Sequence, residues 1–434
     1  MFATIKNHPF KSTKKQILLL CAVFVSIQLL AERNVFQQNA DTAFNSYSGI
    51  VIDKTNGDKL AFAHVLVSNS GISTVTNSEG EFLLKVPASM QNGTVEISFI
   101  GYETLKLPIN SLKQQNNKIS LKQSGFTLPE VNVLPNDASE LIKRMLEERN
   151  NNYSNKDVLM RAFYREIIRK KNSPISISEA IVDVYKQSYS DYQQDKAYIY
   201  KSRKNSDYNK LDTLVFKLMG GPYNTLFVDV VKYPEYFLNT NNLDNYKFHY
   251  LNNERIDDRL IYVVEFKQDP NISDPLPHGK LYIDAQTYGL MKAEFDINLQ
   301  QPEIAAMLFI RKKPYNARVF TTKAHYMVDY KLVNGKWKYA YSRVDLGLKI
   351  DWKKKFFNTY YNTSIEMAAT NWSENIEKNE FKDRILVRPN IVLFDTILGF
   401  NDPDFWGQNN IIEPEKSIEN AINKIQKQLK KTSK

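Results

Sequence analysis

The first third of the chain alternates short apolar runs with turn signals. Between residues 48 and 121, about seven β-prone runs recur at roughly 8–12-residue spacing, separated by turn-forming dipeptides such as Asn92-Gly93. That spacing is typical of a small antiparallel β-sandwich. Gly80 and Gly101 each border such a run, and we expect both to adopt a positive φ, because a side chain would clash there.

A second, longer region shows the alternation of a half-buried sheet. From residue 158 to about 372, runs such as 162–167 and 246–250 are rich in Tyr and Phe, and aromatic residues make up 12% of the chain. Aromatic side chains stabilise cross-strand pairs, so we predict strands here. The clearest are a meander over 279–295 and a hairpin whose tight turn is Asn334-Gly335.

Helical spacing of apolar residues occurs in three places. A helix is predicted to begin after a capping residue, either Asp137 or Ser139. Residues 211–219 and 225–231 flank a Gly-Gly-Pro break and are predicted to form short helices that cover one edge of the sheet. Apolar residues at regular spacing over 418–429 predict a C-terminal amphipathic helix.

The N-terminus has the profile of a signal peptide. Four lysines precede an apolar run from Ile17 to Ala31, which is shorter than the roughly 20 residues that span a bilayer. We expect cleavage near Ala31, with an uncleaved anchor as the alternative, because Leu29 stands where a small side chain is preferred. The single cysteine, Cys21, lies inside this run. The mature chain would then hold no disulfide, catalytic thiol or cysteine-bound metal.

The net charge of +10 does not indicate a nucleic-acid binder. Residues 1–33 contribute +4 and residues 416–434 contribute +5, which leaves +1 for the rest of the chain. Proteins that bind nucleic acid concentrate Lys and Arg on a folded face. We therefore expect no nucleic-acid partner.

Four ordered strings in the first region carry a resemblance to a known family. They are Gly49–Asp53, Ala63–Val65, Thr76–Phe82 and Ser98–Glu103. Together they resemble the carboxypeptidase-regulatory-like domain common in exported proteins of the Bacteroidota. The resemblance implies a transthyretin-like sandwich that serves as an accessory module and has no catalytic residues of its own. The sequence departs from the family at Leu60-Ala61-Phe62, where a proline and a small residue are usual, so we expect a different loop there.

Two further resemblances concern the rest of the chain. Residues 279–295 are similar to the strand pairs of LolA/LolB-like lipoprotein carriers, which imply a curved antiparallel sheet with an apolar concave face. Residues 126–434 resemble an uncharacterised body that accompanies regulatory-like sandwiches. The strings Phe405-Trp406 and Ile411–Pro414 are the most recognisable part of it, and it implies no established activity.

The sequence contains no recognisable catalytic motif. None of its five histidines has a partner at the spacing of a zinc site, and no nucleophile elbow or phosphate-binding glycine loop occurs. We interpret His64, His249 and His325 as ordinary strand residues; His278 also has no partner, and His8 lies in the export segment. We therefore predict no catalytic, cofactor-binding or metal-binding residue and no cofactor.

Two acidic pairs are candidates for glycoside hydrolysis, which needs two carboxylates. Asp257-Asp258 is interpreted as a polar hairpin tip, because short acidic pairs are common in turns. Asp402 and Asp404 lie beside Phe405 and Trp406, a combination that suits binding of a sugar or a cation. We favour a loop whose aromatic side chains pin the last helix, since buried aromatic rings contribute heavily to packing.

These elements predict a mostly β protein. An N-terminal transthyretin-like β-sandwich is followed by a large antiparallel sheet with a few helices. The expected parts are a signal peptide, the sandwich, a linker strand, a β-rich body and a C-terminal loop with a basic amphipathic helix, at residues 1–33, 46–122, 123–136, 137–400 and 401–434.

The absence of catalytic motifs favours a non-enzymatic, exported envelope protein of the periplasm, outer membrane or cell surface. The sandwich would be a docking module, and the body would bind an envelope protein, a lipid or a polymer. Deleting residues 46–122 should then leave the body folded. Two alternatives stay open, namely a periplasmic lipid or lipoprotein carrier with a half-barrel cavity, and a glycan or peptide hydrolase that uses carboxylates.

Overall fold

The computed structural model describes most of the chain after the N-terminal segment. It covers residues 43–423 except 126–136, 172, 207–216, 219, 239, 252, 258, 273, 314, 354–356, 377–380, 382–383, 390–404 and 421. The predicted signal peptide with Cys21, the linker strand from residue 126 and the pair Asp402/Asp404 lie outside the described residues. No described helix is long and apolar enough to cross a membrane.

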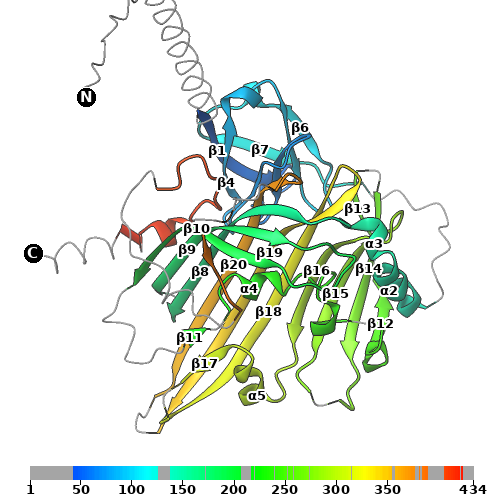
Figure 1. Cartoon of the computed structure of the whole chain (residues 1–434), viewed down its shortest axis with the longest axis vertical. Helices are drawn as coiled ribbons and strands as arrows, with labels where there is room; N and C mark the ends of the chain where they lie inside the picture. The colour runs from blue at the N-terminus through cyan, green and yellow to red at the C-terminus, as the bar shows by residue number, and fades with distance from the viewer. Residues whose placement is uncertain are drawn as a thin grey trace, which may run out of the picture.

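Seven N-terminal strands form two sheets that pack face to face above the rest of the molecule (Figure 1). One sheet has the order β4-β1-β7 and the other the order β3-β2-β5-β6. The elements are β1 (Phe44–Asp53), β2 (His64–Val67), β3 (Ser73–Val75), β4 (Glu81–Pro87), η1 (Ala88–Met90), β5 (Thr94–Ser98), β6 (Leu105–Pro108), η2 (Ile109–Ser111) and β7 (Asn117–Leu121). Alternate residues such as Val51, Phe82 and Ile97 are buried between the two sheets.

The predicted sandwich is confirmed, with one correction to its topology. Gly80 and Gly101 have positive φ angles of 72° and 85°, as expected from their turns. The expectation of a wholly antiparallel arrangement is wrong, because β7 runs parallel to β1. The chain passes through β5 and β6 of the other sheet before β7, so no hairpin joins β7 to its neighbour and fixes an antiparallel direction.

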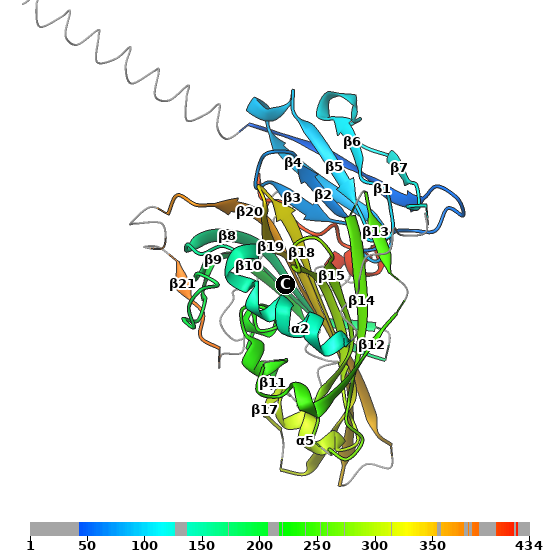
Figure 2. The same cartoon turned by 90° about the vertical axis from the view of Figure 1, so that its right-hand side faces the viewer.

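The body is one twelve-stranded sheet in which all neighbouring strands run antiparallel (Figure 2). The order is β12-β14-β15-β16-β18-β19-β20-β8-β9-β10-β21, and β13 pairs with β14. The strands are β8 (Val158–Lys170), β9 (Ser173–Lys186), β10 (Lys196–Ser206), β12 (Tyr246–Tyr250), β13 (Glu254–Ile256), β14 (Arg259–Gln268), β15 (Pro277–Asp284), β16 (Leu290–Ile297), β18 (Ala317–Val333), β19 (Lys336–Trp352), β20 (Thr359–Ser373) and β21 (Ile385–Leu386).

The meander and the long hairpin predicted from the sequence are both present. β15 pairs with β16, and β18 pairs with β19 across a two-residue turn. In that turn Asn334 and Gly335 have φ angles of 51° and 74°, the conformation that a tight hairpin turn with right-handed twist requires. The large antiparallel sheet is therefore confirmed.

The helices agree with the predictions in part. α2 (Ala138–Glu147) begins after Asp137, whose carboxylate accepts the backbone N–H of Ser139 at 2.8 Å, so Asp137 and not Ser139 is the cap. The predicted helix over 211–219 is wrong at Lys217–Leu218, which forms β11 and pairs with β17 (Ile310–Lys312). The other helices are α3 (Arg149–Asn152), α4 (Tyr223–Leu226), η3 (Pro234–Tyr236), η4 (Leu243–Asn245) and α5 (Pro302–Met307).

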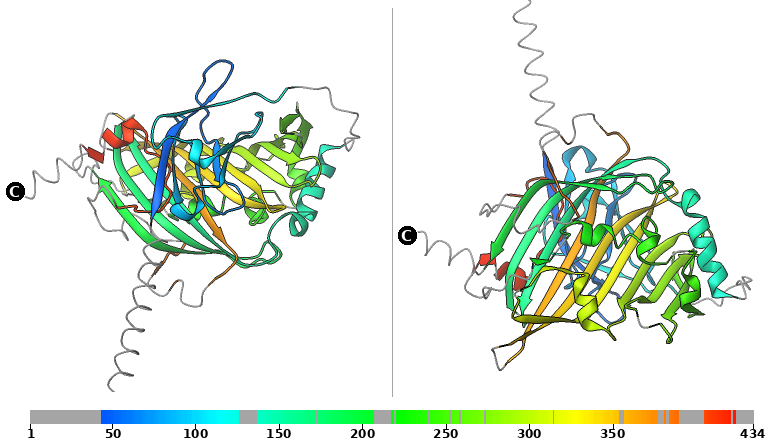
Figure 3. Two further views of the ribbon diagram at one scale, coloured as in Figure 1. Left: turned by 90° about the horizontal axis from the view of Figure 1, so that it is seen from above. Right: turned by 60° about the horizontal axis from the view of Figure 1, so that its bottom comes forward.

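The sheet bends around α2 and α4, and its two faces are covered differently (Figure 3). On the inner face Leu141 of α2, Leu226 of α4 and Phe237 belong to the main apolar core. α4 thus covers a face of the sheet, and the prediction that it covers a sheet edge is wrong. Its apolar side chains are buried by packing on the apolar face of the sheet, which the narrow edge does not offer.

The outer face is covered by the sandwich and by residues 405–418, which we call the strap. Trp406 packs edge-on against Phe163 of β8, with ring centroids 5.5 Å apart, and Ile418 packs against Ile167 and Ile177. Residues 416–420 are helical. The prediction that Phe405 and Trp406 pin the last helix is therefore wrong for Trp406, whose ring is buried on the sheet itself.

Candidate functional site

The sandwich is fixed to the outer face of the sheet, first through the loop before β2. Phe62 stacks on Tyr341 of β19, with ring centroids 5.3 Å apart. Phe62 has a φ of 64°, which is strained for a bulky side chain and persists only where contacts hold it. Nearby, the Ser73 hydroxyl of β3 donates to the backbone carbonyl of Ala369 at 2.8 Å. The segment in which the sequence departs from the family pattern is therefore the segment that contacts the sheet.

A hairpin of the body forms a second attachment. The backbone N–H of Gly101 donates to the carbonyl of Arg255 in β13 at 3.0 Å, and the N–H of Thr104 donates to the Asp257 carboxylate at 2.7 Å. Asp257 lies in the turn between β13 and β14 with a φ of 51°, so the prediction of a polar hairpin tip is confirmed for this residue. Asp258 lies outside the described residues.

The strap forms the third attachment and touches both units. Asn410 pairs with the backbone of Lys85 in β4, accepting its N–H at 2.6 Å and donating to its carbonyl at 3.0 Å. Thr74 of the sandwich donates to the carbonyl of Ile411 at 3.0 Å, and Arg165 of the sheet donates to the carbonyl of Ile412 at 2.8 Å. The strap therefore ties the sandwich to the sheet.

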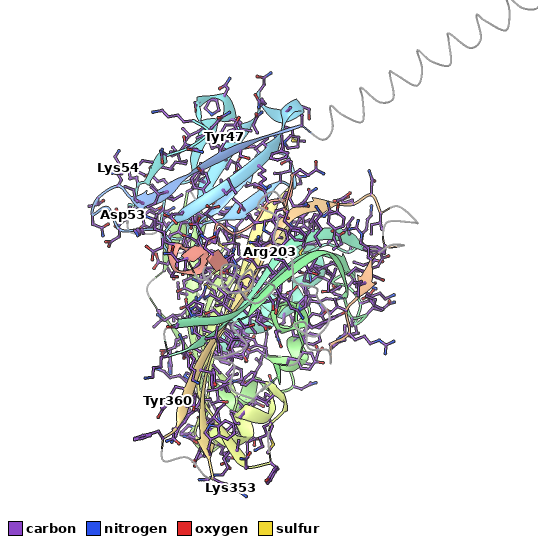
Figure 4. All side chains as sticks on the ribbon, turned by 90° about the vertical axis from the view of Figure 1, so that its left-hand side faces the viewer. Tyr47, Asp53, Lys54, Arg203, Lys353 and Tyr360 are labelled. Atoms are coloured by element: carbon purple, nitrogen blue, oxygen red, sulfur yellow. The ribbon has the colours of Figure 1, made fainter. Side chains whose placement is uncertain are left out.

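A buried charge network lies beneath the strap. The Arg165 side chain is 1% exposed and contacts Glu179 at 2.7 Å and Glu366 at 3.3 Å, while Arg203 contacts Glu179 at 2.6 Å. Figure 4 shows Arg203 beside the red strap. Burial lowers the pKa of Arg165, but attraction to the two carboxylates is larger and the net shift is upward. Because these charges satisfy one another, we assign the network a structural role.

Between the sandwich and the sheet lies a cavity of about 370 Å³. Both units contribute to its walls. The sandwich supplies the loop before β2, the first residue of β2, and residues of β5, β6 and the segment between them. The body supplies β13 to β16, β18 and β19. The lining residues are Phe62, His64, Glu96, Ser98, Phe99, Ile100, Thr104, Lys106, Glu254, Ile256, Asp257, Arg259, Tyr282, Met291, Lys292, Asp329, Tyr330, Lys331, Leu332 and Trp337.

Lys331 of β18 brings a positive charge into this cavity. Its ammonium group donates to the hydroxyl of Ser98 in β5, and no carboxylate of the described residues forms an ion pair with it. Burial lowers the pKa of Lys331 to about 8, because desolvation outweighs the attraction of the carboxylates of Glu96, Asp257 and Asp329. The ammonium group is thus largely protonated at neutral pH, and the hydrogen-bond partner that the described residues give it is the neutral Ser98 hydroxyl.

His64 and Asp329 lie beside this lysine. The His64 Nε2 is 3.6 Å from one carboxylate oxygen of Asp329, and burial lowers the pKa of His64, so the ring is neutral at neutral pH. The other carboxylate oxygen of Asp329 is buried without a hydrogen-bond partner among the described residues. A buried acceptor without a hydrogen bond destabilises the folded state unless a ligand or a water molecule donates a hydrogen bond to it.

The other cations of the walls each contact a carboxylate. Lys106 contacts Glu96 at 3.1 Å, Lys292 contacts Glu294 at 3.3 Å and Arg259 contacts Asp284 at 2.8 Å. Apolar and aromatic surface is supplied by Phe62, Phe99, Tyr282, Met291 and Trp337. The cavity therefore combines one poorly compensated ammonium group, one unsatisfied acceptor and aromatic walls. Such a combination suits a small anionic molecule with an apolar or ring portion.

The histidines are distributed over the strands. His64 faces the cavity, His249 is exposed on β12, and His278 lies on β15. His325 of β18 lies between Glu294 at 3.6 Å and Asp296 at 3.1 Å on the neighbouring strand. In the part of the chain that the structure describes, no three His, Cys, Asp or Glu side chains are grouped so that they could hold a metal ion.

Sequence reasoning did not single out Lys331, Ser98 or Asp329. Asp329 and Lys331 lie two residues apart on β18, whereas Ser98 lies on β5 of the sandwich. No motif links the two strands, so only the docking of the sandwich brings Ser98 to the other two. One signal was present, namely Phe62, where the sequence departs from the family pattern. The family usually has a small residue at this position. The bulky side chain of Phe62 therefore indicates that the loop before β2 packs against another part of the protein, which here is Tyr341 of the sheet.

Residues 47–133 match the family model described as CarboxypepD_reg-like domain. No curated protein matches the chain. Among solved structures, a DUF1329 family protein from Desulfovibrio piger is 11% identical, with a TM-score of 0.23, and the match covers 57% of this chain and 98% of that one. A LolA superfamily protein from Nitrosomonas europaea is 9% identical, with a TM-score of 0.21, and covers 55% and 96%.

A third solved structure, a membrane-associated protein of unknown function from Bacteroides fragilis, is 11% identical, with a TM-score of 0.14, and the match covers 76% of this chain and 99% of that one. TM-scores this low do not assign the body to a fold family. The family match identifies the N-terminal sandwich, as the four sequence strings predicted.

Proposed function

We propose that this protein is a non-enzymatic envelope protein, located outside the cytoplasm, that binds a small anionic molecule between its sandwich and its sheet. The observation that carries the proposal is the Lys331 ammonium group, which lies in a cavity and whose hydrogen-bond partner among the described residues is a neutral hydroxyl. Burying a charge with so little compensation is unfavourable in the empty protein. An anionic ligand would supply the missing partner.

The size and lining of the cavity support a small molecule. Its volume of about 370 Å³ is near the lower end of the range of roughly 300–1,000 Å³ for small-molecule sites. The rings of Phe62, Tyr282 and Trp337 offer surface for an apolar or aromatic portion. The unpaired oxygen of Asp329 can accept a hydrogen bond from a hydroxyl or amine of the same ligand.

In this proposal the sandwich is one wall of the binding site. The stacking of Phe62 on Tyr341 and the strap hold it against the sheet, which differs from a module connected only by a linker. Deletion of residues 46–122 would remove eight of the twenty residues that line the cavity and would expose the part of the outer face that the sandwich covers. These contacts argue against the expectation that the body folds unchanged without its sandwich.

The two alternatives gain less support from the geometry. A lipid carrier needs an open apolar concavity, and the inner face is covered by α2, α4 and residues such as Phe237 and Leu243 that are buried against it. A hydrolase that uses Asp402 and Asp404 would depend on residues outside the described part of the chain. Binding in the cavity on the outer face requires neither.

Phenyl phosphate is a suitable probe, because it joins an anion to an aromatic ring. We expect isothermal titration calorimetry to detect its binding to the whole protein. Changing Lys331→Met should weaken binding by about ten- to a hundredfold, the loss of one charge-assisted hydrogen bond of roughly 1.5–3 kcal/mol. Lys267→Met is the matched control, because Lys267 is exposed on β14 and pairs with Glu265 away from the cavity.

The proposal requires the control to bind like the wild type. Equal binding by all three proteins, or no binding by the wild type, would contradict it. Thermal unfolding of each variant shows whether a loss of binding reflects a loss of the fold.

A further inference from the structure

The end of the sheet farthest from the sandwich exposes a group of large apolar side chains. They are Ile304, Met307, Leu308, Tyr315, Phe357 and Tyr360, and they make up six of the thirteen exposed large apolar residues in the described part of the chain. Within this group of six, Tyr315 and Phe357 are the most exposed, at 93% and 85%. Clustering of such residues at one end of a molecule marks an interaction surface, whereas scattered ones do not.

These side chains come from α5 and the residue after it, from the segments before β18 and after β19, and from the start of β20. α5 packs against β18, and the backbone N–H of Lys353, after β19, donates to the carbonyl of Asn316, before β18, at 3.0 Å. Figure 4 shows Lys353 and Tyr360 at the end of the molecule opposite Tyr47 and Asp53 of the sandwich. We call residues 302–308, 313, 315–318, 349–353 and 357–360 the distal tip.

Positive charge surrounds this apolar group. The charged residues of the distal tip are Glu303, Lys313, Arg318, Lys349, Asp351 and Lys353. Asp351 is neutralised by Arg318 at 2.7 Å. Lys349 lies over the ring of Phe320 at 5.4 Å, while Lys313 and Lys353 are exposed at the two turns. The distal tip thus presents cations next to exposed aromatic and aliphatic groups.

We propose that the distal tip docks onto the surface of an anionic lipid membrane. The rings of Tyr315 and Phe357 would enter the headgroup region, where aromatic side chains are favoured, and Lys313 and Lys353 would contact lipid phosphates. Ile304 and Met307 of α5, and Leu308 directly after it, would add aliphatic contact at the same depth. This role is separate from the cavity and does not depend on it.

Two features favour a lipid surface over a protein partner. The tip consists of protruding turns and one short helix at the end of the long strands β18 and β19, a convex shape that a soft surface accepts without a complementary groove. Lysine is depleted from the centres of protein interfaces but is attracted to anionic lipid. The mixture of exposed lysine and aromatic residues therefore fits a membrane better.

Vesicle co-sedimentation tests this proposal with the chain as recovered after export. We expect binding to vesicles of phosphatidylglycerol and phosphatidylethanolamine in equal amounts, and weaker binding to phosphatidylcholine vesicles or at 0.5 M NaCl. The double variant Tyr315→Ser/Phe357→Ser should reduce the vesicle partition coefficient at least tenfold. The double variant Lys313→Gln/Lys353→Gln should reduce it at least fivefold on the anionic vesicles only.

Matched controls lie elsewhere on the surface. Tyr192→Ser removes a ring that is 86% exposed far from the tip, and Lys247→Gln/Lys267→Gln removes two exposed lysines of β12 and β14. Both controls should bind vesicles like the wild type. The proposal would be overturned if the wild-type protein did not bind anionic vesicles, or if the tip variants bound them as strongly as the wild type. It would also be overturned if the tip substitutions left vesicle binding unchanged and abolished only the binding of a co-purifying protein. Phenyl phosphate binding should be unchanged in all of these variants, which separates this test from that of the cavity.

Discussion

At the scale of single residues, Lys331 shows how a binding role conflicts with stability. Its pKa in the folded protein is about 8, whereas an exposed lysine has a pKa near 10.5. The folded state therefore holds this proton less tightly than the unfolded state does. The resulting penalty is absent above pH 10.5, grows as the pH falls to 8, and is constant below that. At neutral pH the protein carries nearly the full penalty.

Changing Lys331→Met should accordingly stabilise the protein while it weakens anion binding. We expect a gain of about 1 kcal/mol in the free energy of unfolding at pH 7, because the side chain is partly exposed and its bond to Ser98 is lost. The gain should shrink toward pH 10. Urea unfolding at the two pH values measures this difference.

A variant less stable than the wild type at pH 7 would show that Lys331 serves the fold and not a ligand. The Lys267→Met control should change stability little at either pH, since exposed ion pairs contribute about 0–1 kcal/mol.

At the scale of elements, the strap holds the two units together, and Asn410 is its most specific contact. Its side-chain amide forms two hydrogen bonds with the backbone of Lys85, one with the N–H and one with the carbonyl, as the backbone of a neighbouring strand would. Changing Asn410→Ala leaves a partly buried backbone N–H and carbonyl unsatisfied. We expect a loss of about 1–3 kcal/mol in unfolding free energy.

Asn362→Ala provides the comparison, because its amide makes one exposed and longer bond of 3.4 Å to the carbonyl of Lys171. Chemical unfolding should show a much smaller change for this variant. If both variants lose the same stability, the strap does not lock the sandwich in place.

The elements predicted from sequence are those specified by neighbouring residues. The turn Asn334-Gly335, the cap Asp137 and the positive φ of Gly80 depend on local backbone chemistry, and all three are present. Lys217–Leu218 was misassigned because its partner strand, Ile310–Lys312, is distant in the chain. Helical spacing in so short a segment does not distinguish a helix from a strand that finds a partner elsewhere.

The same limit explains why the candidate site was not predicted. Ser98 and Lys331 are in contact because the sandwich docks on the sheet. The residues that flank each of them in the sequence give no indication of this contact. The sequence predicts that His64 is an ordinary strand residue, and it does lie on β2, but its side chain also lines the cavity. Predicting the strand was possible from alternation alone, whereas predicting its neighbours required the tertiary fold.

At the scale of the whole molecule, the structure places two surfaces at opposite ends of one long strand. β18 begins with Ala317 at the distal tip and carries Lys331 near its other end, which corresponds to roughly 45 Å at about 3.3 Å per residue. A protein docked on lipid through its tip would hold the cavity well clear of the membrane. The ligand site would then face the aqueous space of the envelope.

The most direct test of the central claim is to locate a bound probe. A crystal structure with 4-bromophenyl phosphate should show an anomalous bromine peak inside the cavity between the sandwich and the sheet, with the phosphate within hydrogen-bond distance of the Lys331 ammonium group. Crystals of Lys331→Met should lack that peak. A peak elsewhere, or an unchanged peak in the variant, would contradict the assignment of this cavity as the binding site.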